Sequence, residues 1–99
     1  MATPAPKHWL LTYTYVDGIL EKRGPYRTAH LANAKIYLDA GKIVIGGAVG
    51  DPPNSAMLLW GPAASEEDIH RFMQADPYVK AGLVIAWTIS PFTVAVKAA

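Results

Sequence analysis

The order in which two periodicities alternate along the 99 residues constrains the fold more than any other feature of this sequence. Four segments are predicted to be strands: 8–16 and 83–89 alternate with the two-residue period, 42–49 is β-branched and apolar, and 56–60 is a short apolar segment. Two others repeat apolar residues every three to four positions, as helices do, from about Tyr26 to Ala40 and from Ser65 to about Asp76. The predicted order of strand, helix, strand, strand, helix, strand is typical of the ferredoxin-like α+β fold. In that fold a four-stranded antiparallel sheet carries both helices on one face.

The first predicted helix has two apolar faces. Leu31, Ala34 and Leu38 lie at i, i+3 and i+7, and this stripe is expected to pack on the core. His30, Ala34 and Tyr37 share a second face, which should place His30 near the edge of the buried stripe. The charged segment 19–25 is expected to connect the first strand to this helix.

The second predicted helix has clear signals at both ends. Ser65 can cap the amide three residues on, and the acidic residues that follow it favour the positive end of the helix dipole. Pro77 cannot continue a helix, so the helix should end at or just before Asp76.

The first predicted strand is apolar on both of its faces, as expected for a central strand. Helices can cover only one face of its sheet, so the other face must hide Trp and Tyr side chains in another way. The hydrophobic fraction of 52% is also high for a domain of this size, which has much surface for its volume. We therefore expect a homodimer in which two such sheets pack face to face.

Composition excludes several classes of function. The net charge is +1 and no basic run is longer than Lys22-Arg23, so binding to nucleic acid is not expected. The chain has no cysteine, which excludes disulfides, thiolate zinc sites and cysteine nucleophiles. Its three histidines are far apart in the sequence, so neither a metal nor another cofactor is expected.

The length and the N-terminus indicate a single domain, 1–99, with a leader at 1–7 and a core at about 8–93. The leader lacks the features of a signal peptide. No segment approaches the roughly 20 apolar residues of a membrane helix. We therefore expect a cytoplasmic protein without a membrane partner.

His30 and Asp76 are the candidate catalytic residues. Imidazole exchanges protons near neutral pH, and a carboxylate facing it would fix its tautomer. Each residue also has a structural explanation. A half-buried helix histidine can bind a backbone carbonyl, and aspartate before proline commonly forms a turn.

Further residues are candidates for binding a small-molecule substrate. Arg27 lies one helical turn before His30 and could hold an anionic group. Gly46-Gly47 would let a ligand approach backbone amides closely. Aromatic residues of strands more often belong to a core or an interface, and among them Tyr13 is the candidate substrate contact.

The motifs resemble those of the YciI-like (YCII-related) family. They are Arg27-Thr28-Ala29-His30-Leu31, then Gly46-Gly47, then Asp76-Pro77-Tyr78-Val79-Lys80-Ala81-Gly82, and finally Ile89-Ser90-Pro91-Phe92. The resemblance implies a dimeric α+β barrel in which His30 and Asp76 form the catalytic pair of a pocket. The loop 51–54 is short beside that of some relatives, and Ser55 is the nearest hydroxyl that could replace a ligand-binding residue there.

Two functions of different class are compatible with the sequence. The first is a small cofactor-independent enzyme of lyase or isomerase type, acting by acid/base catalysis on a small aromatic molecule or keto acid. The second is a module that binds a small molecule or another protein without catalysis. An enzyme requires His30 and Asp76 within hydrogen-bond reach of each other beside a cavity.

Overall fold

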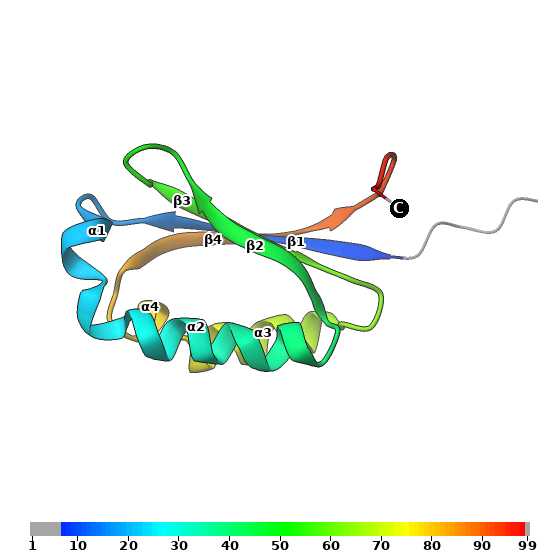
Figure 1. The fold of residues 1–99 in the computed structure, drawn as a ribbon, viewed down its shortest axis with the longest axis horizontal. Coiled ribbons are helices and arrows are strands. Elements are labelled where there is room, and N and C mark those ends of the chain that lie inside the picture. Colours follow the sequence, from blue (N-terminus) through cyan, green and yellow to red (C-terminus); the bar gives the residue numbers. More distant parts are fainter. Residues whose placement is uncertain (1–6, 99) are drawn as a thin grey trace, which may run out of the picture.

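The computed structural model describes residues 7–98, and its strands form one antiparallel sheet (Figure 1). The strands are β1 (His8–Tyr15), β2 (Ile43–Val49), β3 (Ser55–Trp60) and β4 (Val84–Phe92). Their order is β2-β3-β1-β4, and each neighbouring pair is antiparallel. This is the strand order of the ferredoxin-like α+β fold, so the predicted fold class is confirmed. Of the predicted leader, only Lys7 lies within the described residues.

The helices are α1 (Ile19–Lys22), α2 (Gly24–Asp39), α3 (Glu66–Ala75) and α4 (Pro77–Lys80). Figure 1 shows α2, α3 and α4 on the same face of the sheet. The segment 19–25, predicted to be a charged connection, contains α1 and the first residues of α2, so the helix begins two residues earlier than predicted. Proline stands at the first turn of α2, where the missing N–H of its ring removes no helical hydrogen bond.

Proline lies close to two further boundaries, of which the end of α3 confirms the prediction and the end of β4 differs from it. α3 ends at Ala75, and Pro77 then begins the short α4, whose N-terminus is capped by the Asp76 side chain. β4 continues past Pro91 to Phe92. Proline is tolerated there because β4 is an edge strand, where an absent N–H can face away from the sheet.

The core lies between the sheet and α3. Leu11, Trp60, Ile69 and Phe72 are fully buried. The rings of Trp60 and Phe72 meet edge to face at 5.4 Å, and Tyr37 of α2 contacts both. Such aromatic pairs add to the free energy of apolar burial. This cluster holds α2 and α3 against the same part of the sheet.

The face of α2 that packs on the core is not the one predicted. Leu31 and Leu38 are 47% and 51% exposed, whereas His30 is the buried residue of this helix. Ala34 and Tyr37 lie against the core on the same side as His30. The two candidate stripes share Ala34, so periodicity could not separate them. The contacts of Tyr37 with Trp60 and Phe72 decide the rotation of the helix.

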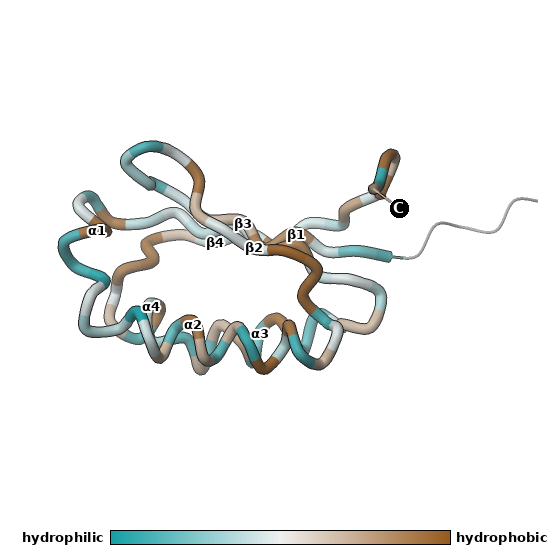
Figure 2. The backbone as a smooth tube through the Cα atoms, viewed as in Figure 1, coloured by the Kyte–Doolittle hydropathy of each residue, from teal (hydrophilic) through white to brown (hydrophobic). Residues whose placement is uncertain are grey.

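The aromatic side chains of the central strands point toward the helices, which corrects the expectation that the uncovered face would be aromatic. Tyr13 and Trp60 are fully buried on the helix side. The opposite face carries aliphatic residues such as Ile45 and Met57, which are 66% and 45% exposed. Figure 2 shows the apolar character of β2 beside the hydrophilic loop that joins β2 to β3.

Among the described helices, none combines the length and the apolar character that crossing a bilayer requires.

We expect Phe72→Ala to lower the free energy of unfolding by about 3–5 kcal/mol, because it opens a cavity in the aromatic cluster. Urea denaturation followed by circular dichroism measures the change. Gln74→Ala, at an exposed position of the same helix, is the matched control and should change the free energy little. An equal effect of the two substitutions would contradict the assignment of Phe72 to the core.

Asp68 joins the N-terminus of α3 to the start of β2. Its carboxylate accepts hydrogen bonds from the Ser65 backbone N–H and from Lys42 Nζ, both at 3.0 Å. These two groups, with the backbone N–H first, lower the pKa of Asp68 below its ordinary value. The carboxylate therefore stabilises the folded state above the ordinary pKa of about 4 and loses this effect as the pH falls through its lowered pKa.

We expect Asp68→Asn to destabilise the protein most at neutral pH, with the difference from wild type shrinking below about pH 4. Chemical denaturation at a series of pH values measures this difference. Glu66→Gln removes a charge from the same helical turn without removing these two bonds, and it should have a smaller effect. A difference between Asp68→Asn and wild type that does not vary with pH would refute the role of this carboxylate.

Candidate active site

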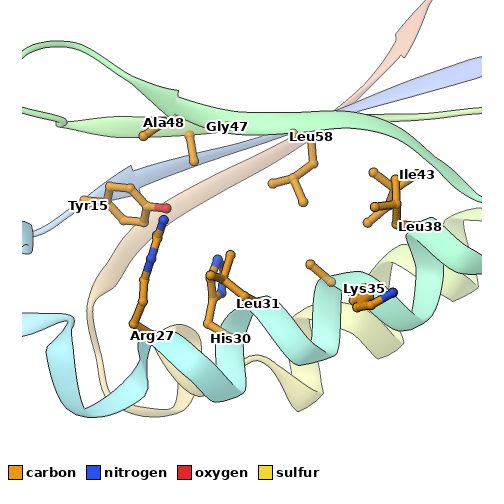
Figure 3. A pocket seen from close by; sticks show the side chains of 13 residues that line it. Tyr15, Arg27, His30, Leu31, Lys35, Leu38, Ile43, Gly47, Ala48 and Leu58 are labelled. Carbon is orange, nitrogen blue, oxygen red and sulfur yellow. The ribbon is translucent and has the colours of Figure 1, made fainter.

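A cavity of about 370 Å³ lies between α2 and the strands β2 and β3 (Figure 3). This volume falls within the range of small-molecule sites. Figure 3 shows Tyr15, Arg27 and His30 at one end of the cavity, and Leu38 and Ile43 at the other. One end therefore offers polar atoms, whereas the remaining wall is largely apolar.

His30 and Asp76 meet at the polar end. The distance from His30 Nδ1 to Asp76 Oδ1 is 2.7 Å, although the residues are 46 positions apart in the sequence. The His30 residue is 8% exposed and lines the cavity, and Asp76 is fully buried behind it. The hydrogen-bond contact that sequence spacing could not establish is thus present beside a cavity.

Asp76 is held by three groups. Its Oδ2 accepts a hydrogen bond from the Tyr13 hydroxyl at 2.9 Å, and its Oδ1 accepts one from the Tyr78 backbone N–H at 3.0 Å. The third partner is His30 Nδ1. Because a carboxylate only accepts hydrogen bonds, Nδ1 carries the hydrogen and the lone pair of the neutral ring is on Nε2. None of the described residues forms a hydrogen bond with Nε2.

The His30 ring is also fixed on its face. The Tyr78 ring stacks on it with a centroid distance of 3.7 Å and an interplanar angle of 2°. The Tyr78 hydroxyl accepts a hydrogen bond from Arg27 Nη1 at 3.3 Å. The imidazole is therefore oriented by a carboxylate at one edge and by an aromatic ring over one face.

The sequence Asp76-Pro77-Tyr78 explains locally how these contacts arise. Asp76 has an extended backbone, with φ −71° and ψ 118°, and its side chain caps α4 by accepting the Tyr78 N–H. Pro77 favours the first turn of that helix. The short helix then carries the Tyr78 ring to the face of His30.

Tyr13, which was predicted to be a substrate contact, is not among the residues that line this cavity. Its side chain is fully buried, and its hydroxyl is used by Asp76. Burial, and then the Asp76 carboxylate, raise the pKa of Tyr13 well above its ordinary value. The hydroxyl therefore stays protonated and donates to Asp76.

The other predicted substrate contacts divide into two groups. Arg27, Gly46 and Gly47 line the cavity, whereas Ser55, at the start of β3, is not among the residues that line it. A Cβ atom on Gly46 would approach the Leu58 Cγ to 3.1 Å, so a side chain there would crowd the wall. At Gly47 a Cβ would meet nothing within 4 Å, so packing does not require glycine at that position.

Among the cavity residues that sequence reasoning did not predict are Tyr15, Leu31 and Leu38. Strand alternation placed Tyr15 on the same face as Tyr13 without showing that its hydroxyl lies at a cavity. The two leucines were predicted to be core, and their exposure is the signal that distinguishes a cavity wall from a packed interior.

No three His, Asp or Glu side chains within residues 7–98 gather as a metal site would require.

The fold is similar to that of solved structures. One is the 5-chloro-2-hydroxyhydroquinone dehydrochlorinase of Burkholderia phenoliruptrix AC1100, in complex with 2,5-dihydroxybenzoquinone. The alignment has a TM-score of 0.71 and 26% identity, and it covers 87% of this chain and 93% of the dehydrochlorinase chain. No protein with a curated description matches the sequence.

Two proteins from Agrobacterium tumefaciens, one of them of the NIPSNAP family, share the fold with a TM-score of 0.57 each. Their identities to this chain are 15% and 12%, and the alignments cover 90% and 88% of it and 93% and 90% of theirs. At these identities the likeness concerns the fold alone.

The YCII-related domain matches residues 8–93, from the first residue of β1 to just beyond the end of β4. The match includes His30, Asp76 and every residue that lines the cavity. The chain therefore belongs to the YCII-related domain family.

Proposed function

We propose that this protein is a small enzyme in which His30 acts as general base and acid, oriented by Asp76, in a lyase or isomerase reaction. The observation that carries the proposal is the 2.7 Å contact between the imidazole and the buried carboxylate at the wall of a cavity. This contact leaves Nε2 as a proton acceptor at the cavity. Proton transfer between these side chains and a substrate needs no metal or organic cofactor.

In this proposal His30 Nε2 removes a proton from an activated carbon or hydroxyl of the substrate. The Asp76 carboxylate stabilises the imidazolium that forms. The electron pair left on the substrate moves toward a carbonyl oxygen or expels a leaving group. In an isomerisation the imidazolium returns the proton at another position, and in an elimination it gives the proton up after the leaving group departs.

Negative charge that develops on the substrate needs a positive partner. Arg27 lies one turn before His30 on α2, and its side chain points into the polar end of the cavity (Figure 3). β2 is an edge strand, so some backbone groups near Gly46 and Gly47 lack a partner in the sheet. The guanidinium and the backbone amides are the groups proposed to stabilise this charge.

The substrate class is proposed from the cavity and from its relative. The apolar wall and a volume of about 370 Å³ suit a small, largely flat molecule. The similar dehydrochlorinase holds 2,5-dihydroxybenzoquinone, an oxygenated ring of this size. A small aromatic or quinonoid compound, or a keto acid, is therefore the proposed substrate.

The protein is also proposed to act as a homodimer. The uncovered face of the sheet exposes Ile45 and Met57, and pairing with a second copy would remove these side chains from water. Face-to-face packing of two sheets would form the α+β barrel that the resemblance implies.

His30→Ala should reduce turnover by about two to four orders of magnitude, because the variant lacks the side chain proposed to transfer the proton. Absorbance assays with chlorinated hydroxyhydroquinones and small keto acids first identify a substrate of the wild type, and the variant is then compared on it. His70→Ala is the matched control, since His70 is exposed on α3 and outside the cavity. Full activity of His30→Ala would refute the proposal. Binding without turnover by wild type would favour a binding module.

We expect Met57→Lys to shift the protein from dimer to monomer, because the charge would be buried at the paired faces. Sedimentation velocity measures the mass of each species. Ile36→Lys, at an exposed position on α2 that is 64% accessible, should leave the mass unchanged. A monomeric wild type, or a dimer that Met57→Lys does not weaken, would show that this face does not pair.

A further inference from the structure

Tyr15 is a buried residue at the polar end of the cavity that the proposed mechanism does not use. It is 8% exposed, at the C-terminal end of β1. Its ring contacts the rings of Tyr13 and Tyr78, with centroid distances of 6.4 and 6.1 Å. These are the two tyrosines that position the catalytic pair, so the Tyr15 ring is held by rigid neighbours.

The hydroxyl of Tyr15 differs from those of its neighbours. The Tyr13 hydroxyl donates to Asp76, and the Tyr78 hydroxyl accepts from Arg27. The Tyr15 hydroxyl has no hydrogen-bond partner among the described residues, and it is open to the cavity, because Trp60 Nε1 is the only described side-chain polar atom that is both buried and unpartnered. A hydroxyl that the described residues leave unpaired at the wall of a cavity can form a hydrogen bond with a polar atom of a ligand bound there.

The hydroxyl is aimed at the cavity. Tyr15 lines it, and Figure 3 shows the hydroxyl and the Arg27 side chain extending toward each other across its polar end. Burial raises the pKa of Tyr15 to about 12, against the opposing effect of Arg27 and Arg23. At neutral pH the group is therefore a protonated hydrogen-bond donor beside a cation.

We infer that Tyr15 donates a hydrogen bond to an oxygen of the bound substrate, which Arg27 contacts from the other side. This inference rests on the proposed function and narrows its substrate class. The ligand is a flat molecule with a carbonyl, phenolate or enolate oxygen close to the atom that exchanges its proton with His30. Its remaining surface lies against the apolar wall.

The placement of these groups determines which molecules the site accepts. Tyr15 comes from β1, whereas Arg27 and His30 lie three residues apart on one face of α2. An oxygen held between the hydroxyl and the guanidinium therefore lies next to the imidazole. A ligand without that oxygen would leave the Tyr15 hydroxyl without a partner in the complex and would bind less tightly, since a site built to hydrogen-bond a substrate oxygen discriminates against analogues that lack it.

The test is the dissociation constant of 2,5-dihydroxybenzoquinone for the full chain, measured by absorbance titration at neutral pH. We expect Tyr15→Phe to weaken binding about 10- to 100-fold, the range for a lost hydrogen bond to a charged group. Tyr26→Phe removes the same atom from a tyrosine outside the cavity lining, and it should bind as wild type does. Circular dichroism and thermal melting confirm that each variant is folded.

The His30→Ala variant separates this inference from the proposed function. If Tyr15→Phe binds as tightly as wild type while His30→Ala loses turnover, the role of Tyr15 is refuted and the acid/base proposal stands. If Tyr15→Phe weakens binding while His30→Ala retains turnover, Tyr15 is supported and the acid/base proposal fails. A wild type that does not bind the quinone overturns the inference about Tyr15 and its substrate class.

Discussion

The buried carboxylate of Asp76 is the group on which the arrangement of the site depends. Burying a charged group away from water costs on the order of several kcal/mol unless the group is paired and hydrogen-bonded. Asp76 is fully buried and accepts hydrogen bonds from Tyr13, Tyr78 and His30. The contacts with Tyr13 and His30 tie β1 and α2 to the junction of α3 and α4. The imidazole of His30 is held in place because it is one of the hydrogen-bond partners that replace water around the buried carboxylate.

The hydrogen bonds that stabilise the buried Asp76 carboxylate also orient the site for catalysis. The carboxylate sets the His30 tautomer, and the stacked Tyr78 ring limits rotation of the imidazole. Both constraints exist before any ligand binds, so a bound substrate would meet an oriented acceptor. Preorganised groups of this kind act on a transition state without the cost of reordering. The same contacts that stabilise the fold thus support the proposed acid/base role.

The cavity depends on what the packing of α2 leaves open. Because His30 and Tyr37 turn inward, Leu31 and Leu38 are displaced to the exposed side of the helix and line the cavity. On the opposite wall, Gly46 and Gly47 of β2 have no side chains to fill the space. An apolar face of α2 and the glycine pair of β2 therefore remain unpacked beside the polar end. A small apolar ring is the kind of molecule that would fill this space.

Several features could be predicted because they arise from local physics. The alternation in the strands and the Ser65 cap with its acidic turn were sufficient for the order of elements and the ferredoxin-like class. His30 and Asp76 could be singled out by residue type and motif. Their mutual contact could not, since nothing in a spacing of 46 residues specifies a distance in space.

Local sequence was sufficient for residue chemistry and for the periods of helices and strands, because these depend on neighbours within a few positions. Which stripe of α2 faces the core, that Tyr13 serves Asp76, and that the Tyr15 hydroxyl lies unpaired at a cavity were decided only by tertiary packing. The physical reason is that burial is a property of the assembled interior. A side chain has the same sequence neighbours whether it faces a ring, a carboxylate or an empty space.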